Sequence, residues 1–210
     1  MRTLRITGKA VLSERPDTFI INFPIQEICG DHIDAMERLN AKVERLRDIL
    51  SNNNLDPKLL KTSSFSVGKE KKWNSKSDEY INLGYKASHS VSIELPLNQE
   101  LMNNILLDLA TQDLDIEFNI DFVLKDTKTL IERLIKNAIE NAKENAELIA
   151  TSTGVKLKEI INIDYSFNEI RFIHSDLDMC LLESSEISLP DIEPNDVEAE
   201  KTITITWSLE

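Results

Sequence analysis

The sequence predicts an α+β fold with a largely antiparallel sheet and helices packed on one face. Several stretches alternate apolar with polar residues, as half-buried strands require. Others repeat apolar residues at intervals of three and four, as amphipathic helices require. In chain order these stretches predict the elements ββ-α-ββ-α-β-α-β-β. Hydrophobic residues make up 41% of the 210 residues and charged residues 29%, which is typical of a globular protein.

The first two strands are predicted to form a β-hairpin over residues 2–28. Alternating stretches lie on both sides of Arg15-Pro16-Asp17, which is a turn signal because Pro fixes φ and Asp bonds nearby backbone donors. Pro24 cannot donate a hydrogen bond to a neighbouring strand, which favours a sheet edge or a bulge at that position.

A helix is predicted to follow, because Asp31 is a suitable N-cap and Asp34 adds favourable charge in the first turn. The segment Asn52-Asn53-Asn54, followed by Pro57, ends it. Its apolar stripe consists of Ile33, Met36, Leu39, Val43, Leu46 and Leu50.

Two more strands are predicted over residues 60–72 and 80–95, joined by a polar loop that contains Trp73. The basic segment Lys69–Lys72 is predicted to be a solvated loop tip. His89 falls on the apolar face of the second strand, where a buried, hydrogen-bonded histidine is the usual arrangement. That face consists of Tyr85, Ala87, His89, Val91, Ile93 and Leu95.

The second half of the chain begins with a predicted helix after Asn98. Strands are predicted over residues 115–124 and 158–167. The last strand starts at Val197 and alternates regularly through Trp207, which predicts an exposed edge able to pair with another subunit.

A long third helix is predicted between those two strands. It starts at Asp126 or at Thr129, where Thr129-x-x-Glu132 matches a capping box. Gly154 is its natural left-handed C-cap.

This order predicts three regions. Residues 1–96 together with 190–210 form one sub-domain, and residues 97–167, with the order α-β-α-β, form a second one of ferredoxin-like character. Residues 168–189 form an irregular acidic segment.

The formal net charge of −13 predicts that the protein does not bind nucleic acid, because it repels phosphate backbones. The two cysteines, Cys29 and Cys180, exclude a disulfide scaffold and leave a single bridge open. The sequence contains no run of 18 consecutive apolar residues, so no transmembrane segment is predicted. The first strand begins without a signal-peptide pattern. We expect a cytoplasmic protein as the chain is written, and a periplasmic one if a signal peptide has been removed.

Several segments together resemble the SIMPL-domain family, also called DUF541 or the oxidative-stress-defence family, which includes periplasmic 26–28 kDa antigens. The resemblance spans nearly the whole chain in matching order. It lies at Gly8-Lys9-Ala10 with Arg15-Pro16-Asp17, Thr62-Ser63-Ser64-Phe65-Ser66, Gly84-Tyr85-Lys86-Ala87-Ser88, Gly154-Val155 after the Ala-rich helix, and Ile192-Glu193-Pro194. It implies an α+β protein of two intertwined sub-domains, large homo-oligomers in some members, export in many, and a link to stress resistance. It implies no catalytic residues. The acidic segment before the last strand and the missing signal peptide depart from the family's pattern.

Small residues recur at every fourth position of the third helix and predict close packing. They are Ala138, Ala142, Ala146 and Ala150. This spacing lets a helix approach a neighbour closely, either the protein's own sheet, which we favour, or a helix of another subunit.

A second candidate site lies in the acidic segment. His174, Asp176, Asp178 and Cys180 are two residues apart, so in an extended segment they project from one face and offer donors to a divalent metal. A solvated acidic loop is the favoured alternative.

No catalytic residues and no cofactor are predicted. The five glycines are scattered singly and form no phosphate-binding loop. The many serines lie on polar strand faces or at strand ends, and none occurs in a nucleophile elbow.

The leading hypothesis is therefore a non-enzymatic protein that self-associates. One alternative is a metal-dependent protein or enzyme that uses His174, Asp176 and Asp178. Another is a monomeric adaptor that binds a partner through the acidic residues 168–196.

Overall fold

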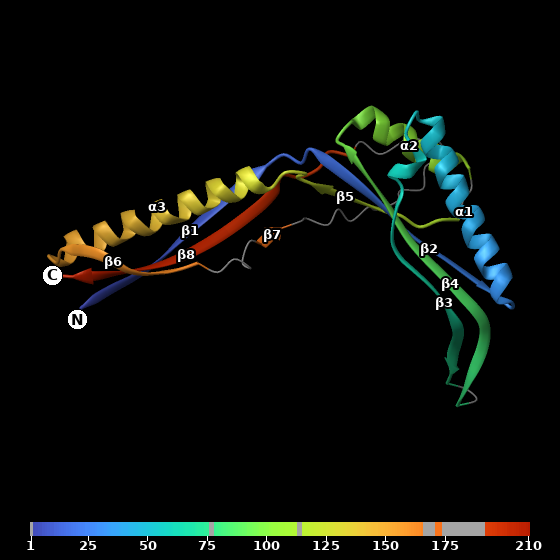
Figure 1. Cartoon of the computed structure of the whole chain (residues 1–210), viewed down its shortest axis with the longest axis horizontal. Coiled ribbons are helices and arrows are strands. Elements are labelled where there is room, and N and C mark those ends of the chain that lie inside the picture. The colour runs from blue at the N-terminus through green and yellow to red at the C-terminus, as the bar shows by residue number, and fades with distance from the viewer. Residues whose placement is uncertain (1, 76–77, 113–114, 166–170, 174–191) are drawn as a thin grey trace. The chain divides into compact units, whose positions relative to one another are not determined.

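The computed structural model describes residues 2–75, 78–112, 115–165, 171–173 and 192–210. Its contacts divide the chain into two compact units, each with its own antiparallel sheet (Figure 1). Unit 1 comprises Met1–Pro16, Leu124–Leu182 and Pro194–Glu210, and unit 2 comprises Asp17–Val123 and Glu183–Glu193. Helices and antiparallel sheets confirm the predicted α+β class.

Unit 1 is a sheet covered on one face by a single long helix among its described elements. The strand order is β1-β8-β6, and β7 also pairs with β8. The helix α3 packs on β1 and β8. The bounds are β1 Thr3–Glu14, α3 Lys128–Thr153, β6 Leu157–Asp164, β7 Arg171–Ile173 and β8 Val197–Leu209.

Unit 2 contains a sheet of order β3-β4-β2-β5. The helix α1 packs on β2 and β4, and α2 packs against α1. The bounds are β2 Thr18–Cys29, α1 His32–Asn52, a 3-10 turn Pro57–Leu59, β3 Lys61–Asn74, β4 Glu79–Pro96, α2 Gln99–Thr111 and β5 Asn119–Val123.

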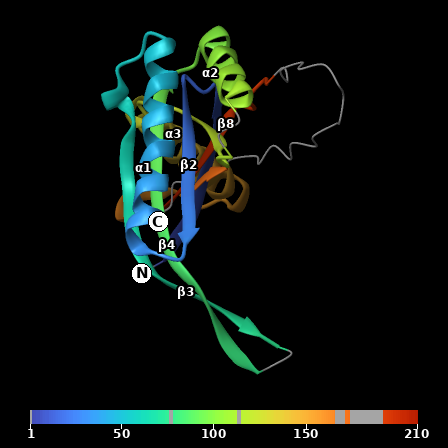
Figure 2. The same cartoon turned by 90° about the vertical axis from the view of Figure 1, so that its right-hand side faces the viewer.

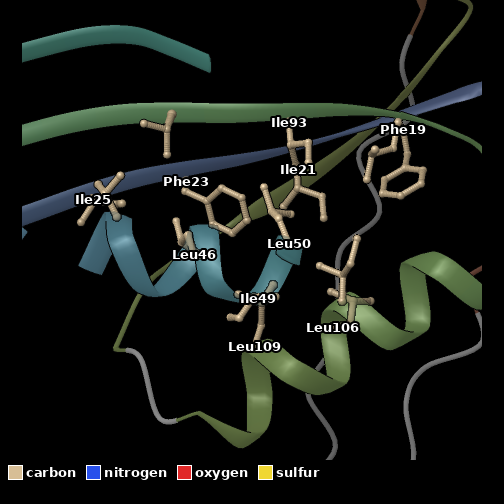
Figure 3. Close-up of a cluster of buried hydrophobic side chains, with 14 of the residues drawn as sticks. Phe19, Ile21, Phe23, Ile25, Leu46, Ile49, Leu50, Ile93, Leu106 and Leu109 are labelled. Carbon is tan, nitrogen blue, oxygen red and sulfur yellow. The ribbon is translucent and has the colours of Figure 1, made fainter. Parts of the chain in front are cut away.

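The core of unit 2 is built from alternate residues of β2 and β4 and from the apolar faces of α1 and α2. Figure 3 shows β2 side chains directed at α1 and α2. Burial of each large apolar side chain contributes about 1.5–3 kcal/mol, so this cluster is the main stabilising element of the unit. Its labelled members are Phe19, Ile21, Phe23, Ile25, Leu46, Ile49, Leu50, Ile93, Leu106 and Leu109.

The ends of the helices follow local chemistry. Asp31 is the N-cap of α1, as predicted, and its Oδ1 accepts a hydrogen bond from the backbone N of Ile33 at 2.8 Å. Gly154 is the left-handed C-cap of α3, as predicted. The capping box at Thr129 is wrong, because α3 begins at Lys128, whose N–H donates to Asp126 Oδ1 at 2.9 Å.

The predicted stripe of α1 is right in its centre and wrong at its start. Leu39, Val43, Leu46 and Leu50 are buried. Ile33 is 62% exposed, because it lies in the first turn, beside the N-cap. Ala35 and Ile49 complete the buried face.

The predicted hairpin over residues 2–28 is wrong. β1 pairs with β8 along its whole length, from Thr3 opposite Ser208 to Glu14 opposite Val197. β2 pairs instead with β4 and β5. Asp17 is hydrogen bonded within unit 2, since its N donates to Val123 O and its O accepts from Leu97 N. The chain therefore passes from one sheet to the other at Pro16 instead of folding back.

The predicted free edge at the last strand is also wrong. β8 lies between β1 on one side and β6 and β7 on the other. The alternate apolar residues of β8 form a buried face against α3, in which Trp207 is only 5% exposed.

The unit boundaries differ from the predicted sub-domains. β1 belongs to unit 1 and β2 to unit 2, so the predicted region 1–96 is divided. The predicted ferredoxin-like run 97–167 is also divided, because α2 lies in unit 2 and α3 in unit 1.

Candidate interaction surface

The β3–β4 hairpin is longer than the core of unit 2 requires. β2 ends at Cys29, which pairs with Tyr85. From Gly84 to Glu79, β3 is therefore the only neighbour of β4 among the described strands. We call this two-stranded extension, residues 69–75 and 78–84, the arm. It continues beyond the ends of β2 and α1 (Figures 1 and 2). Isolated two-stranded ribbons are marginally stable in water, which indicates that the arm needs further contacts.

Apolar side chains lie on both faces of the arm. Trp73 and Tyr80 are directly opposite each other, with ring centroids 4.9 Å apart in an edge-to-face arrangement. Ile81 occupies the next register position and so points to the other face. Trp73 is 47% exposed, Tyr80 68% and Ile81 47%. The arm therefore presents apolar surface that the described part of unit 2 does not cover.

The basic segment lies in this arm and not in a loop. Lys69, Lys71 and Lys72 are residues of β3, and all are exposed. The predicted loop tip is wrong, because β3 continues through Trp73 to Asn74 and pairs there with Glu79. β3 is the edge strand of its sheet, so these lysines flank an open edge.

The opposite edge of the same sheet is acidic. Residues 115–121 comprise the segment before β5 and the first residues of that strand, whose other side is open in the described sheet. The segment contains Asp115, Glu117 and Asp121 and no basic residue. Phe118, within it, is 37% exposed.

Lys42 of α1 fixes the start of this acidic edge. Its Nζ donates to the backbone O of Asp115 at 2.8 Å and forms an ion pair with Glu27 Oε1 at 2.6 Å. The Lys42 side chain is only 17% exposed, so this link lies against the body of unit 2. The acidic edge is therefore held in place before any partner binds.

Gly84 shapes the root of the arm. Its φ is +109°, and a Cβ there would lie 2.2 Å from the backbone O of Cys29. A register shift lies beside it in the β3–β4 pairing. Only glycine allows β4 to bend here while passing so close to the end of β2.

His89 lies on the core-facing side of β4, as predicted, but it is half-buried instead of fully buried. Thr62 Oγ1 and His89 Nε2 are hydrogen bonded at 2.8 Å, and the Phe65 ring meets the imidazole edge-to-face at 5.4 Å. His89 Nδ1 has no hydrogen-bond partner among the described residues. Burial, and next the charge of Arg47, lower the pKa of His89 from 6.5.

We expect His89 to make unit 2 less stable in mild acid. The unfolded chain takes up a proton at His89 near pH 6.5, whereas the folded chain does so only at lower pH. The free energy of unfolding should therefore fall as the pH decreases below 6.5 and level off below the folded pKa. Urea unfolding at pH 7.5, 6.5 and 5.5 measures the slope. His89→Gln should flatten it, and an unchanged slope in that variant would contradict the assignment to His89.

The alanines of α3 lie against the sheet of their own unit. Ala138, Ala142 and Ala146 are fully buried, and Ala150 is 4% exposed. A Cβ placed on Gly8 of β1 would lie 2.0 Å from the backbone O of Ala138, so helix and strand are in direct backbone contact there. Residues spaced four apart shift gradually round the surface of α3. The line of alanines that contacts the sheet therefore follows the twist of β1 and β8. The face they would offer another subunit is therefore covered.

The predicted metal residues, His174, Asp176, Asp178 and Cys180, lie outside the described residues, as does most of the acidic segment. Within the described ranges, no group of three or more His, Cys, Asp or Glu side chains could hold a metal ion. Cys29 is half-buried at the end of β2. None of the described helices is long and apolar enough to cross a membrane.

Lys201 is a buried residue that sequence reasoning missed. It lies opposite Ala10 on the α3-facing side of β8 and is 0% exposed. Its Nζ lies 4.6 Å from the centroid of the Tyr165 ring, a cation–π contact. The sequence pattern could have predicted this burial, because Lys201 occupies one of the apolar positions of the alternating last strand.

Comparison with known proteins agrees with the resemblance seen in the sequence. Residues 4–207, nearly the whole chain, match the SIMPL family, described as a protein of unknown function (DUF541). No curated protein matches the chain. The chain therefore belongs to the SIMPL (DUF541) family.

Proposed function

We propose that this protein is a non-enzymatic, self-associating protein, and that the arm is a contact between copies. The observation that carries the proposal is the pair Trp73 and Tyr80 on a two-stranded ribbon, beside which the described part of the chain places no third strand. Aromatic residues supply large contact areas at low entropic cost, which is why they are frequent at interfaces. A second copy offers the same surface at the same concentration as the arm itself.

Electrostatics supports self-association over a nucleic-acid partner. The lysines of the arm are surrounded by a chain of net charge −13, so the long-range field repels polyanions. An acidic surface of another copy attracts the arm instead. The family membership is compatible with this role and assigns none.

The mass in solution tests the proposal. Wild-type protein should elute from gel filtration with a light-scattering mass that is a multiple of 24.0 kDa. Trp73→Ser/Tyr80→Ser should shift the mass towards the monomer, because it removes the apolar contact of the arm. The arm carries no core residue of unit 2, so the far-UV circular dichroism should stay unchanged.

Leu59→Ser is the matched control. Leu59 is 38% exposed, lies in the same unit and comes just before β3, at the end of that strand opposite to the arm, so this variant should keep the wild-type mass. A wild-type protein that is monomeric at every concentration, with or without added divalent metal, would overturn the proposal. That result would leave the arm to a different protein partner.

A further inference from the structure

We propose that the basic edge of the arm of one copy docks on the acidic edge, residues 115–121, of the next copy. This inference rests on the proposed function and adds to it the identity of the receiving surface. Both surfaces belong to unit 2 and to opposite edges of one sheet. The contact would join the sheets of successive copies into one.

The backbone of both edges is available for this pairing. β3 and β5 are the two terminal strands in the order β3-β4-β2-β5, so each has one side without a strand neighbour in the described sheet. Unpaired edges are templates for a strand from another chain. β5 is short, Asn119–Val123, so the backbone edge that the arm would meet is these five residues, and residues 115–118 precede it outside the strand.

Charge selects this pairing over a pairing between two arms. Lysine on an edge strand opposes association with a like edge, and the arm segment of β3 carries Lys69, Lys71 and Lys72 against the single carboxylate of Glu70. Two arms side by side would therefore repel each other. The acidic edge carries three carboxylates, Asp115, Glu117 and Asp121, and no lysine or arginine, so it attracts this segment of β3.

Apolar side chains accompany the charges on both edges. Trp73 follows the lysines on β3, and Phe118 follows Glu117 on the acidic edge. Phe118 is 37% exposed while its ring lies 6.2 Å from that of Phe23, so it is anchored on the core and still accessible. Lys42 holds the backbone of Asp115, which lowers the entropic cost of binding the arm.

Different edges meeting in this way make a head-to-tail contact. Such contacts repeat from copy to copy and give a ring when the rotation closes and a filament when it does not. An arm-to-arm contact would give a closed dimer. The two arrangements are distinguished by mixing variants.

A charge exchange tests the receiving surface. Lys71→Glu and Glu117→Lys should each lower the light-scattering mass, because each places like charges across the contact. The double variant Lys71→Glu/Glu117→Lys should recover the wild-type mass. Glu37→Lys is the control for Glu117→Lys: it changes the net charge of the chain by the same amount, is exposed on α1 and should leave the mass unchanged.

Mixing tests the head-to-tail arrangement. Trp73→Ser/Tyr80→Ser keeps its acidic edge, and Glu117→Lys keeps its arm, so an equimolar mixture should form dimers containing one copy of each and nothing larger. Absence of dimers in the mixture would overturn the inference. So would a wild-type mass for Glu117→Lys when the arm variant is monomeric, a result that leaves the proposed self-association intact.

Discussion

Replacing Ala142 by glutamate is expected to unfold unit 1. Ala142 is 0% exposed, and its Cβ lies 2.7 Å from the position of a Cβ placed on Gly8, so the site has no room for a longer side chain. Glutamate would have to bury its charge between α3 and β1 or push the helix off the sheet. Displacing α3 would expose Ile203, Ile205 and Trp207. We expect a loss of about 4 kcal/mol or more in the free energy of unfolding.

Trp207 fluorescence in urea measures this loss. The chain has two tryptophans, and Trp207 is the one that lies in the core of unit 1. In a Trp73→Phe background, which leaves it as the single tryptophan probe, its emission follows the unfolding of that unit.

Leu148→Glu is the matched control, because Leu148 lies on the same helix and is 65% exposed. Its effect should stay within about 0.5 kcal/mol. If Ala142→Glu instead kept its fold and only its light-scattering mass fell towards that of the monomer, α3 would be a contact between subunits.

The second large effect is expected at the root of the arm. Gly84→Ala should destabilise unit 2 by about 3 kcal/mol, because a non-glycine residue at this positive φ is strained and its Cβ overlaps a backbone oxygen. The φ is +109°, and the overlap with Cys29 O is at 2.2 Å. Relief of the overlap requires β4 to move away from the end of β2.

Gly68→Ala is the matched control for this change. Gly68 lies in β3 close to Gly84, and a Cβ there meets nothing within 4 Å. Hydrogen exchange of the backbone amides in β4 from residue 85 to residue 90, followed by mass spectrometry, should speed up in Gly84→Ala only. Equal exchange in the two variants would show that Gly84 carries no special backbone requirement.

Local patterns were sufficient to predict most elements of the fold. Asp31 and Gly154 mark helix ends because their side-chain and backbone chemistry acts within one turn. The alternation of the strands at either end of the chain follows from one buried face each. Pro24 is consistent with this logic, because β5 pairs with β2 only as far as Asn22, so one side of Pro24 is open.

Strand pairing could not be predicted in the same way. Arg15-Pro16-Asp17 has turn chemistry, yet β1 and β2 join different sheets. The pairing of β1 with β8 spans nearly the whole chain, and its stability depends on a shared face against α3 that no short pattern contains.

The arm was missed for a related reason. A polar, lysine-rich segment with a tryptophan has the composition of a loop, and its strand conformation depends on cross-strand contacts such as that of Trp73 with Tyr80. The acidic edge could not be predicted from the sequence either, because Asp115 and Glu117 form an edge only where β5 ends the described sheet.

The α+β class, the helix ends at Asp31 and Gly154, the alternating faces of the strands and the SIMPL family could all be read from the sequence. These features depend on interactions within a few residues or on order along the chain. The tertiary structure alone decided which strands pair, that the alanines of α3 meet Gly8, and that a basic edge and an acidic edge terminate one sheet. Those features depend on contacts between residues distant in the chain, whose energies arise only once the sheets are assembled.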